Sequence, residues 1–132
     1  MTYTLAATRS EVAEQLQEAG IEAMDYIPEV LNPPLAIVFA GDPYITLNDT
    51  EKKTFKDVQV RLEVRVVAGR ATNEVATDTL DDLICQVLIA LGNWDLQQVS
   101  QPFSYAPNGD ANATYLAADV VLTANITIEE VA

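Results

Sequence analysis

The chain has 132 residues, of which 49% are hydrophobic, 7 are basic and 20 are acidic, so its net charge is −13. A chain of this length and hydrophobicity can bury a core of its own, and we expect one domain over residues 1–132. The acidity argues against tight binding of nucleic acid through its phosphates, because such binding needs a continuous basic surface.

Several residue types on which catalysis and metal binding rely are missing or scarce. The sequence has no histidine, and Cys85 is its only cysteine. It therefore lacks the commonest general base, the Ser-His and Cys-His pairs, and the ligands of a thiolate metal cage. Its glycines are isolated, and no glycine-rich phosphate loop occurs. We expect no enzyme, no cofactor and no metal site. We also expect no membrane span, since the longest apolar run, residues 35–40, is too short.

The first predicted element is a helix that begins at residues 8–11 and ends at Gly20. The sequence Thr8-Arg9-Ser10-Glu11 has the spacing of a capping box, and glycine is a common C-terminal stop. Three prolines punctuate the following stretch, residues 21–34, and predict irregular structure there.

Two strands follow, and each has its own pattern. Residues 35–40 form a continuous apolar run, typical of a strand buried on both faces, and Gly41-Asp42-Pro43 is expected to end it. Residues 44–47 are a short extended piece that leads into a polar turn at 48–53. In residues 58–67, valine or leucine alternates with polar residues as far as Val66, which predicts a strand with one core face and one charged face.

A second helix is predicted over residues 73–91, with a broad apolar stripe and a stop at Gly92. Cys85 and Ile89 lie off that stripe, beside Asp78 and Asp82. One interpretation is that the first helix partly covers them. The other is a subunit contact, because exposed apolar side chains on an acidic face suggest a partner.

The last third of the chain predicts a second hairpin. Residues 94–104 have weaker strand character, and Pro102 favours an edge strand. A turn at 107–110 leads to a long strand, residues 116–128, whose second face is small and mostly uncharged. The predicted fold is α+β: a mainly antiparallel sheet of about four to five strands with two helices packed on one face.

Several of these segments resemble a known family. They are Ala19-Gly20-Ile21, Asp25-Tyr26-Ile27-Pro28-Glu29, Pro33-Pro34-Leu35-Ala36-Ile37-Val38, Gly41-Asp42-Pro43-Tyr44-Ile45, the strand 58–67 and the helix 73–91. In this order they resemble the tail terminator proteins of long-tailed (siphovirus-like) bacteriophages, especially those of actinobacterial hosts. The motifs are structural, and they bring no active-site residue with them.

The resemblance implies a structural virion protein of the tail's neck region, assembled in the host cytoplasm. Such proteins form a ring, usually a hexamer, at the head-proximal end of the tail tube. The ring stops addition of tube protein and presents the surface on which the head-closure or connector protein docks. Genomic DNA passes through the lumen without specific binding. The expected partners are therefore further copies of the chain, the tail tube protein and the connector.

The charge distribution offers a pair of surfaces for such a ring. A cyclic ring joins one face of each subunit to a different face of the next. Residues 52–70 hold six of the seven basic residues, whereas residues 71–132 hold none. A basic set is therefore predicted to meet an acidic helix of a neighbour, although pairing within one subunit is the alternative. The basic set is Lys52, Lys53, Lys56, Arg61, Arg65 and Arg70, and the helix carries Glu74, Asp78, Asp81, Asp82, Cys85 and Ile89.

Two loops are predicted to dock other proteins, because protruding polar loops are common contact elements. They are represented by Tyr44, Asn48 and Asp49 in the first loop and by Asn108 and Asp110 in the second. Two other functions stay open at this point. One is another neck protein, such as a head-closure or adaptor subunit. The other is a small cytosolic enzyme or binding domain that uses carboxylates.

Overall fold

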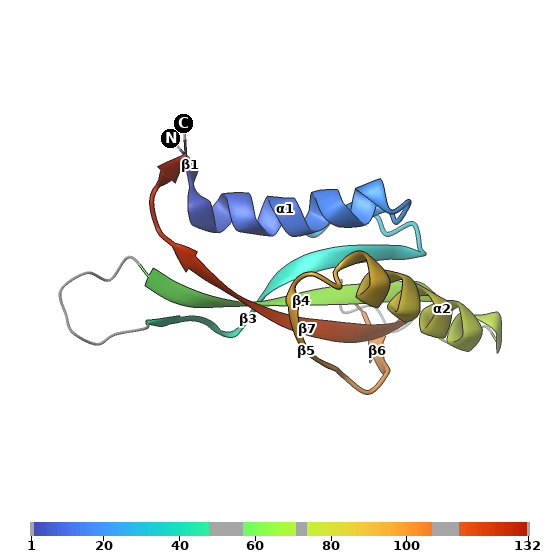
Figure 1. The fold of residues 1–132 in the computed structure, drawn as a ribbon. Coiled ribbons are helices and arrows are strands. Elements are labelled where there is room, and N and C mark those ends of the chain that lie inside the picture. Colours follow the sequence, from blue (N-terminus) through green and yellow to red (C-terminus); the bar gives the residue numbers. More distant parts are fainter. Residues whose placement is uncertain (1, 48–56, 71–73, 107–113, 132) are drawn as a thin grey trace.

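A computed structural model describes residues 2–47, 57–70, 74–106 and 114–131. It confirms the α+β fold, with two helices packed on a mostly antiparallel sheet (Figure 1). The elements are β1 (Thr2–Tyr3), α1 (Thr4–Glu18), β2 (Ala23–Met24), β3 (Leu35–Leu47), β4 (Asp57–Arg70), α2 (Glu74–Ala90), β5 (Asp95–Val99), β6 (Phe103–Tyr105), β7 (Tyr115–Thr127) and β8 (Glu130–Val131). The main sheet has six strands, slightly more than expected, in the order β2-β3-β4-β7-β5, and β6 also pairs with β7.

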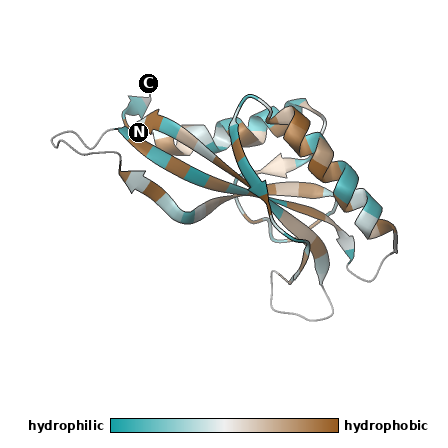
Figure 2. Ribbon diagram, turned by 60° about the horizontal axis from the view of Figure 1, so that its bottom comes forward, coloured by the Kyte–Doolittle hydropathy of each residue, from teal (hydrophilic) through white to brown (hydrophobic). Residues whose placement is uncertain are grey.

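Strand β4 lies at the centre of the sheet, between β3 and β7. Its alternating sequence places every second side chain under the helices, and these are fully buried: Val58, Val60, Leu62, Val64 and Val66. Figure 2 shows the resulting bands of hydrophilic and hydrophobic residues along the long strands. The alternation predicted over residues 58–67 is therefore confirmed, and its valines and leucine form the floor of the core.

Both helices close this core from the same side. Helix α1 contributes Val12 and Leu16, and α2 contributes Leu80 and Val87, all four of which are fully buried. The ends of the helices are also tied together, because the indole Nε1 of Trp94, just after α2, donates to the side-chain oxygen of Gln15 in α1. The side of the sheet under the helices is called the helix side below, and the opposite side is called the bare side.

The predicted start of the first helix is wrong. Helix α1 begins at Thr4, and Thr8 lies inside it with its hydroxyl donating to the Thr4 carbonyl oxygen at 2.7 Å. The true start is set by distant residues, since the Thr4 hydroxyl donates to the Thr127 carbonyl oxygen (2.7 Å) and accepts from the Glu129 amide (3.2 Å). The predicted stop is correct, because Gly20 has a positive φ of 87°.

Strand β3 does not end at Gly41-Asp42-Pro43, as the sequence predicted, but continues to Leu47. The segment is a bulge: pairing with β4 shifts register between Ala40 and Ile45, and the Asp42-Pro43 peptide bond is cis. Gly41 lies so close to β4 that an added Cβ would come within 2.8 Å of the Arg61 backbone oxygen. A glycine at this position allows the two strands to approach.

Part of the bare side carries a second, smaller core. Leu35, Ile37, Val67 and Ala117 are buried there together with Leu31 of the proline-rich segment. Residues 35–38 of β3 are thus buried on both sides of the sheet, as their apolar run predicted. The second face of β7 is also buried within the chain from Ala117 to Thr123, which leaves less of it open to a partner than its small residues suggested.

Candidate subunit interface

The outward surface of α2 is acidic, and two aliphatic residues are exposed near its ends, Val75 at the start and Ile89 at the finish. Asp78, Asp82, Cys85 and Ile89 follow one another at helical spacing, and all four are exposed. Ile89 is 82% exposed, so α1 does not cover it. Asp81 is exposed as well, and α2 begins at Glu74, whose side chain lies outside the described set. This α2 surface therefore combines negative charge with an uncovered aliphatic side chain.

A hollow of about 210 Å³ adjoins the α2 surface. Asp82, Thr79 and Gln86 contribute polar groups to it, and Pro34, from the segment that enters β3, forms part of its wall. A carboxylate beside an apolar wall suits a side chain with an aliphatic stem and a cationic end. The hollow is thus a place where a basic residue of a neighbouring surface would fit.

The basic residues of β4 lie on the other side of the sheet. Arg61 and Arg65 project from the bare side, since they alternate with the buried leucine and valines of the helix side. The guanidinium of Arg65 is already engaged within the chain. Its Nε and Nη2 atoms donate to the two carboxylate oxygens of Asp119 at 2.8 and 3.0 Å.

Three aromatic rings surround the same guanidinium. Its central carbon lies 4.7 Å from the ring centre of Phe39, 5.0 Å from that of Phe103 and 4.8 Å from that of Tyr105. Aromatic faces attract cations, and a bidentate pair fixes the orientation of the guanidinium. The hydrogen bond to Asp119 is the main cause that raises the Arg65 pKa above its usual value. Arg65 therefore joins β3, β4, β6 and β7 and is not available to a neighbouring subunit.

Glu63 and Arg61 extend the charged row on the bare side towards the β3–β4 hairpin. Partial burial and the nearby Asp119 carboxylate raise the pKa of Glu63, while Arg61 and Arg65 partly offset this rise. The Nε atom of Arg61 is buried and has no hydrogen-bond partner among the described residues. Unlike Arg65, Arg61 therefore has no bidentate carboxylate partner among the described residues.

The remaining predicted interface residues are placed as follows. Arg70 is exposed at the end of β4, with its guanidinium 5.7 Å from the Tyr115 ring centre. Tyr44 lies in β3 and packs partly against the helix-side core, so it is less exposed than a docking residue should be. The other predicted residues of the basic set and the two loops lie outside the described ranges: Lys52, Lys53, Lys56, Asn48, Asp49, Asn108 and Asp110.

Sequence reasoning missed Asp119 as the partner of Arg65. A signal for it exists, because Asp119 is the only charged residue on its face of the long strand β7, directly across from Arg65. A single acid in such a small, uncharged face indicates a buried ion pair with the neighbouring strand. The aromatic rings around Arg65 come from separate elements and have no such signal in the sequence.

Comparison with known proteins adds no family assignment. Neither the models of protein families nor the curated protein sequences give a match to this chain. Within residues 2–47, 57–70, 74–106 and 114–131, no group of three or more acidic or cysteine side chains is arranged to hold a metal ion. Over the same part of the chain, no helix combines the length and the apolar character that crossing a membrane requires.

Proposed function

We propose that this chain is a structural subunit of a phage virion that forms a ring at the head-proximal end of the tail tube. In this role the ring ends tube polymerisation, receives the head connector and leaves a lumen for the DNA. The proposal combines the resemblance in sequence with the surface of α2. The single observation that carries the ring is Ile89, which is 82% exposed near the C-terminal end of the acidic helix α2.

The proposed contact between copies joins two different surfaces of the subunit. The α2 surface faces outward from the helix layer, whereas Arg61 projects from the opposite, bare side of the sheet. The Arg61 cation on one side of the subunit and the acidic helix on the other can meet in a heterologous contact, which closes into a ring when the rotation allows. In this arrangement the α2 surface of one copy lies against the part of the bare side of the next copy that carries Arg61 and Glu63. The hollow beside Asp82 then receives a basic side chain.

The function is tested by electron microscopy of tails assembled with and without this chain. A terminator limits the tube, so we expect tubes of unregulated length when the chain is omitted and a narrow length distribution when it is restored. Tubes of unchanged length would contradict the terminator role. If heads then fail to join tails of normal length, the chain is instead a head-closure or adaptor subunit.

The interface is tested separately by charge reversal. Asp78→Lys with Asp82→Lys places two positive charges on the α2 surface, where the model of the ring needs negative ones. Glu11→Lys with Glu18→Lys makes the same charge change on exposed positions of α1. We expect the α2 variant to lose incorporation into tails by at least tenfold and the α1 variant to be retained. Equal loss in both, with both proteins folded by circular dichroism, would refute the assignment of the interface to α2.

A further inference from the structure

Helix α1 lacks the local signals that usually stabilise the ends of a helix. Tyr3, at its N-cap position, supplies no side-chain cap, no acidic residue lies in the first turn, and no basic residue lies in the last. The first amides of a helix have no partner within it, so they need such groups or bonds from elsewhere. An isolated helix of 15 residues is also marginal in water. The position of α1 therefore depends on its bonds to other elements.

The start of α1 is held by a clasp, which consists of the paired strands β1 and β8 together with Thr4 (Figure 1). The Thr4 amide donates to the Glu129 carbonyl oxygen at 2.9 Å, and its hydroxyl makes the two bonds to Thr127 and Glu129 described above. The Thr127 hydroxyl donates to the Asp57 carboxylate at 2.8 Å and so ties the clasp to β4. All three side-chain bonds are exposed. Water can therefore compete for each of them.

The apolar contacts of α1 are smaller than those of α2. Helix α1 buries three apolar side chains, namely Val12, Ala13 and Leu16, and its fourth buried side chain is the polar Thr8. The described part of α2 buries four apolar side chains, and Leu91 directly after it is buried as well: Ala76, Leu80, Leu83 and Val87. Packing of an apolar face supplies most of the stability of a helix in a protein. Helix α1 is therefore held less firmly on the sheet than α2.

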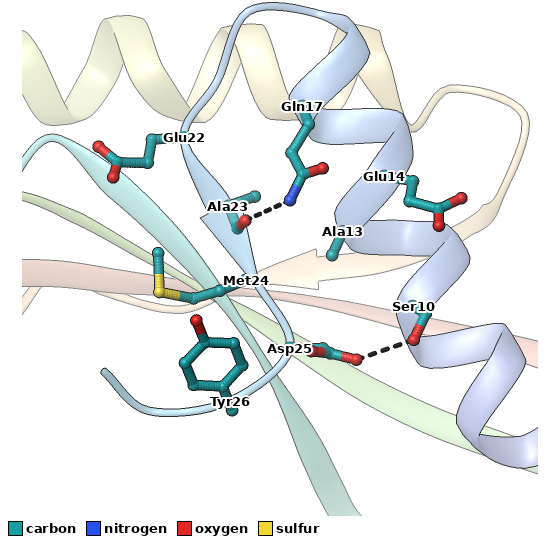
Figure 3. Close-up of a pocket in the computed structure, with 9 residues that line it drawn as sticks. All are labelled: Ser10, Ala13, Glu14, Gln17, Glu22, Ala23, Met24, Asp25 and Tyr26. Atoms are coloured by element: carbon teal, nitrogen blue, oxygen red, sulfur yellow. Dashed lines mark hydrogen bonds between the residues drawn. The ribbon is translucent and has the colours of Figure 1, made fainter. Parts of the chain in front are cut away.

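The other polar bonds of α1 leave the centre of the sheet untouched. Its Ser10 and Gln17 side chains donate to residues 23–25 (Figure 3), the segment that follows α1 at the edge of the sheet. The Gln15 side chain donates to that of Asn93 at 3.0 Å, next to the indole bond described above. None of these bonds takes part in the pairing of β3, β4 and β7. Helix α1 can thus detach while those three strands stay paired.

We propose that α1 opens as a separate unit and that the clasp sets how often it opens. Partial opening is expected where an element has few buried apolar side chains and exposed hydrogen bonds. Release of the clasp frees the start of α1, and detachment of the helix then uncovers the part of the helix-side core against which Val12 and Leu16 pack. The step involves neither the α2 surface nor Arg61. It is therefore independent of the proposed contact between copies.

Native-state hydrogen exchange of the full chain in low concentrations of urea tests this proposal. The protection factors of amides in residues 8–18 are compared with those of α2 and β4. We expect protection in α1 to be at least tenfold lower and to depend less on urea, because partial opening exposes less surface than global unfolding. Equal protection of α1 and α2, or one common urea dependence for α1 and β4, would overturn the separate opening of α1.

A variant of the clasp tests what controls the opening. Thr4→Val keeps the shape of the side chain but removes both bonds of the hydroxyl, so we expect exchange in α1 to accelerate at least fivefold and exchange in α2 and β4 to change less than twofold. Thr46→Val is the matched control, because Thr46 is an exposed threonine of β3 outside the clasp. We expect it to change exchange in α1 less than twofold. No acceleration of α1 by Thr4→Val, or equal acceleration in all three elements, would refute the role of the clasp.

Discussion

The two sides of the central sheet are stabilised in different ways. On the helix side, β4 contributes only aliphatic side chains, all fully buried, and stability comes from the removal of apolar surface from water. On the bare side, the same strand contributes Arg65, whose ion pair and ring contacts tie four strands together. The same strand therefore contributes to an apolar core on one side and to an ion pair of fixed geometry on the other. Substitutions on the two sides should therefore respond differently to salt and pH.

The largest effect is expected for Leu62→Ala on the helix side. Leu62 is fully buried between β3 and β7, so its truncation leaves a cavity and should lower the free energy of unfolding by about 3 kcal/mol. Urea unfolding at low and high salt would measure it. We expect the same loss at both salt concentrations, and a strong salt dependence would contradict the purely apolar account of this side.

Asp119→Ala should be next, with a loss of about 2 kcal/mol, because it leaves the Arg65 charge partly buried without its carboxylate. The side chains of the pair are 23% and 13% exposed, so solvent reduces the loss expected for a fully buried pair. A double-mutant cycle with Arg65→Met isolates the coupling. We expect the double variant to be more stable than the sum of the single effects predicts, and strictly additive losses would refute the coupling.

Gly41→Ala tests the bulge that lies beside Arg61. An added Cβ would come within 2.6 Å of the Arg61 Cγ atom and 2.8 Å of its backbone oxygen, so we expect a loss of about 1–2 kcal/mol. Gly69 is the matched control, because it also lies at a register shift but has no atom within 4 Å of an added Cβ. Thermal unfolding of Gly69→Ala should differ little from the parent protein. Similar losses in both variants would show that the close approach at Gly41 is not the cause.

The smallest effect is expected for Glu63→Gln, and its sign depends on pH. Burial and Asp119 raise the pKa of Glu63 in the folded state, so its ionised form lowers stability at neutral pH. The variant should be more stable by about 0.5 kcal/mol at pH 7, a small gain because solvent screens the group. The gain should disappear below the ordinary pKa of 4.5, where both states of the parent protein are protonated. A gain that does not change with pH would contradict this cause.

The sequence predicted the helix side better than the bare side. The alternation in β4 as far as Val66 and the broad stripe of α2 identified most of the buried valines and leucines, because burial of apolar residues follows the period of each element. The predicted start of α1 was wrong, because Thr4 is held by residues at the other end of the chain. The predicted end of β3 was also wrong, because the bulge depends on the fit of Gly41 against β4. Contacts between distant segments leave no periodic pattern.

The candidate interface was predictable to a similar degree. Cys85 and Ile89 were expected off the apolar stripe of α2, and both are exposed. The pairing of Arg65 was not predicted, although the lone acid Asp119 on the small, uncharged face of β7 was a signal for it. A groove of about 340 Å³ between α1 and residues 22–26 also escaped prediction (Figure 3), since the mutual position of its two walls depends on tertiary packing.

The most direct test of the ring is chemical cross-linking between its two proposed faces. Cys85 is the only cysteine and lies exposed on α2, and Asn125→Cys adds a second thiol at an exposed position of β7 on the bare side. A bismaleimide with a short spacer, applied to isolated tails, should then produce a ladder of dimers, trimers and larger species that ends at the copy number of the ring. Proteins with either thiol alone should not form the ladder. Cross-linking that stops at dimers, or no cross-linking between the two positions, would contradict a ring built from α2 and the bare side of the sheet.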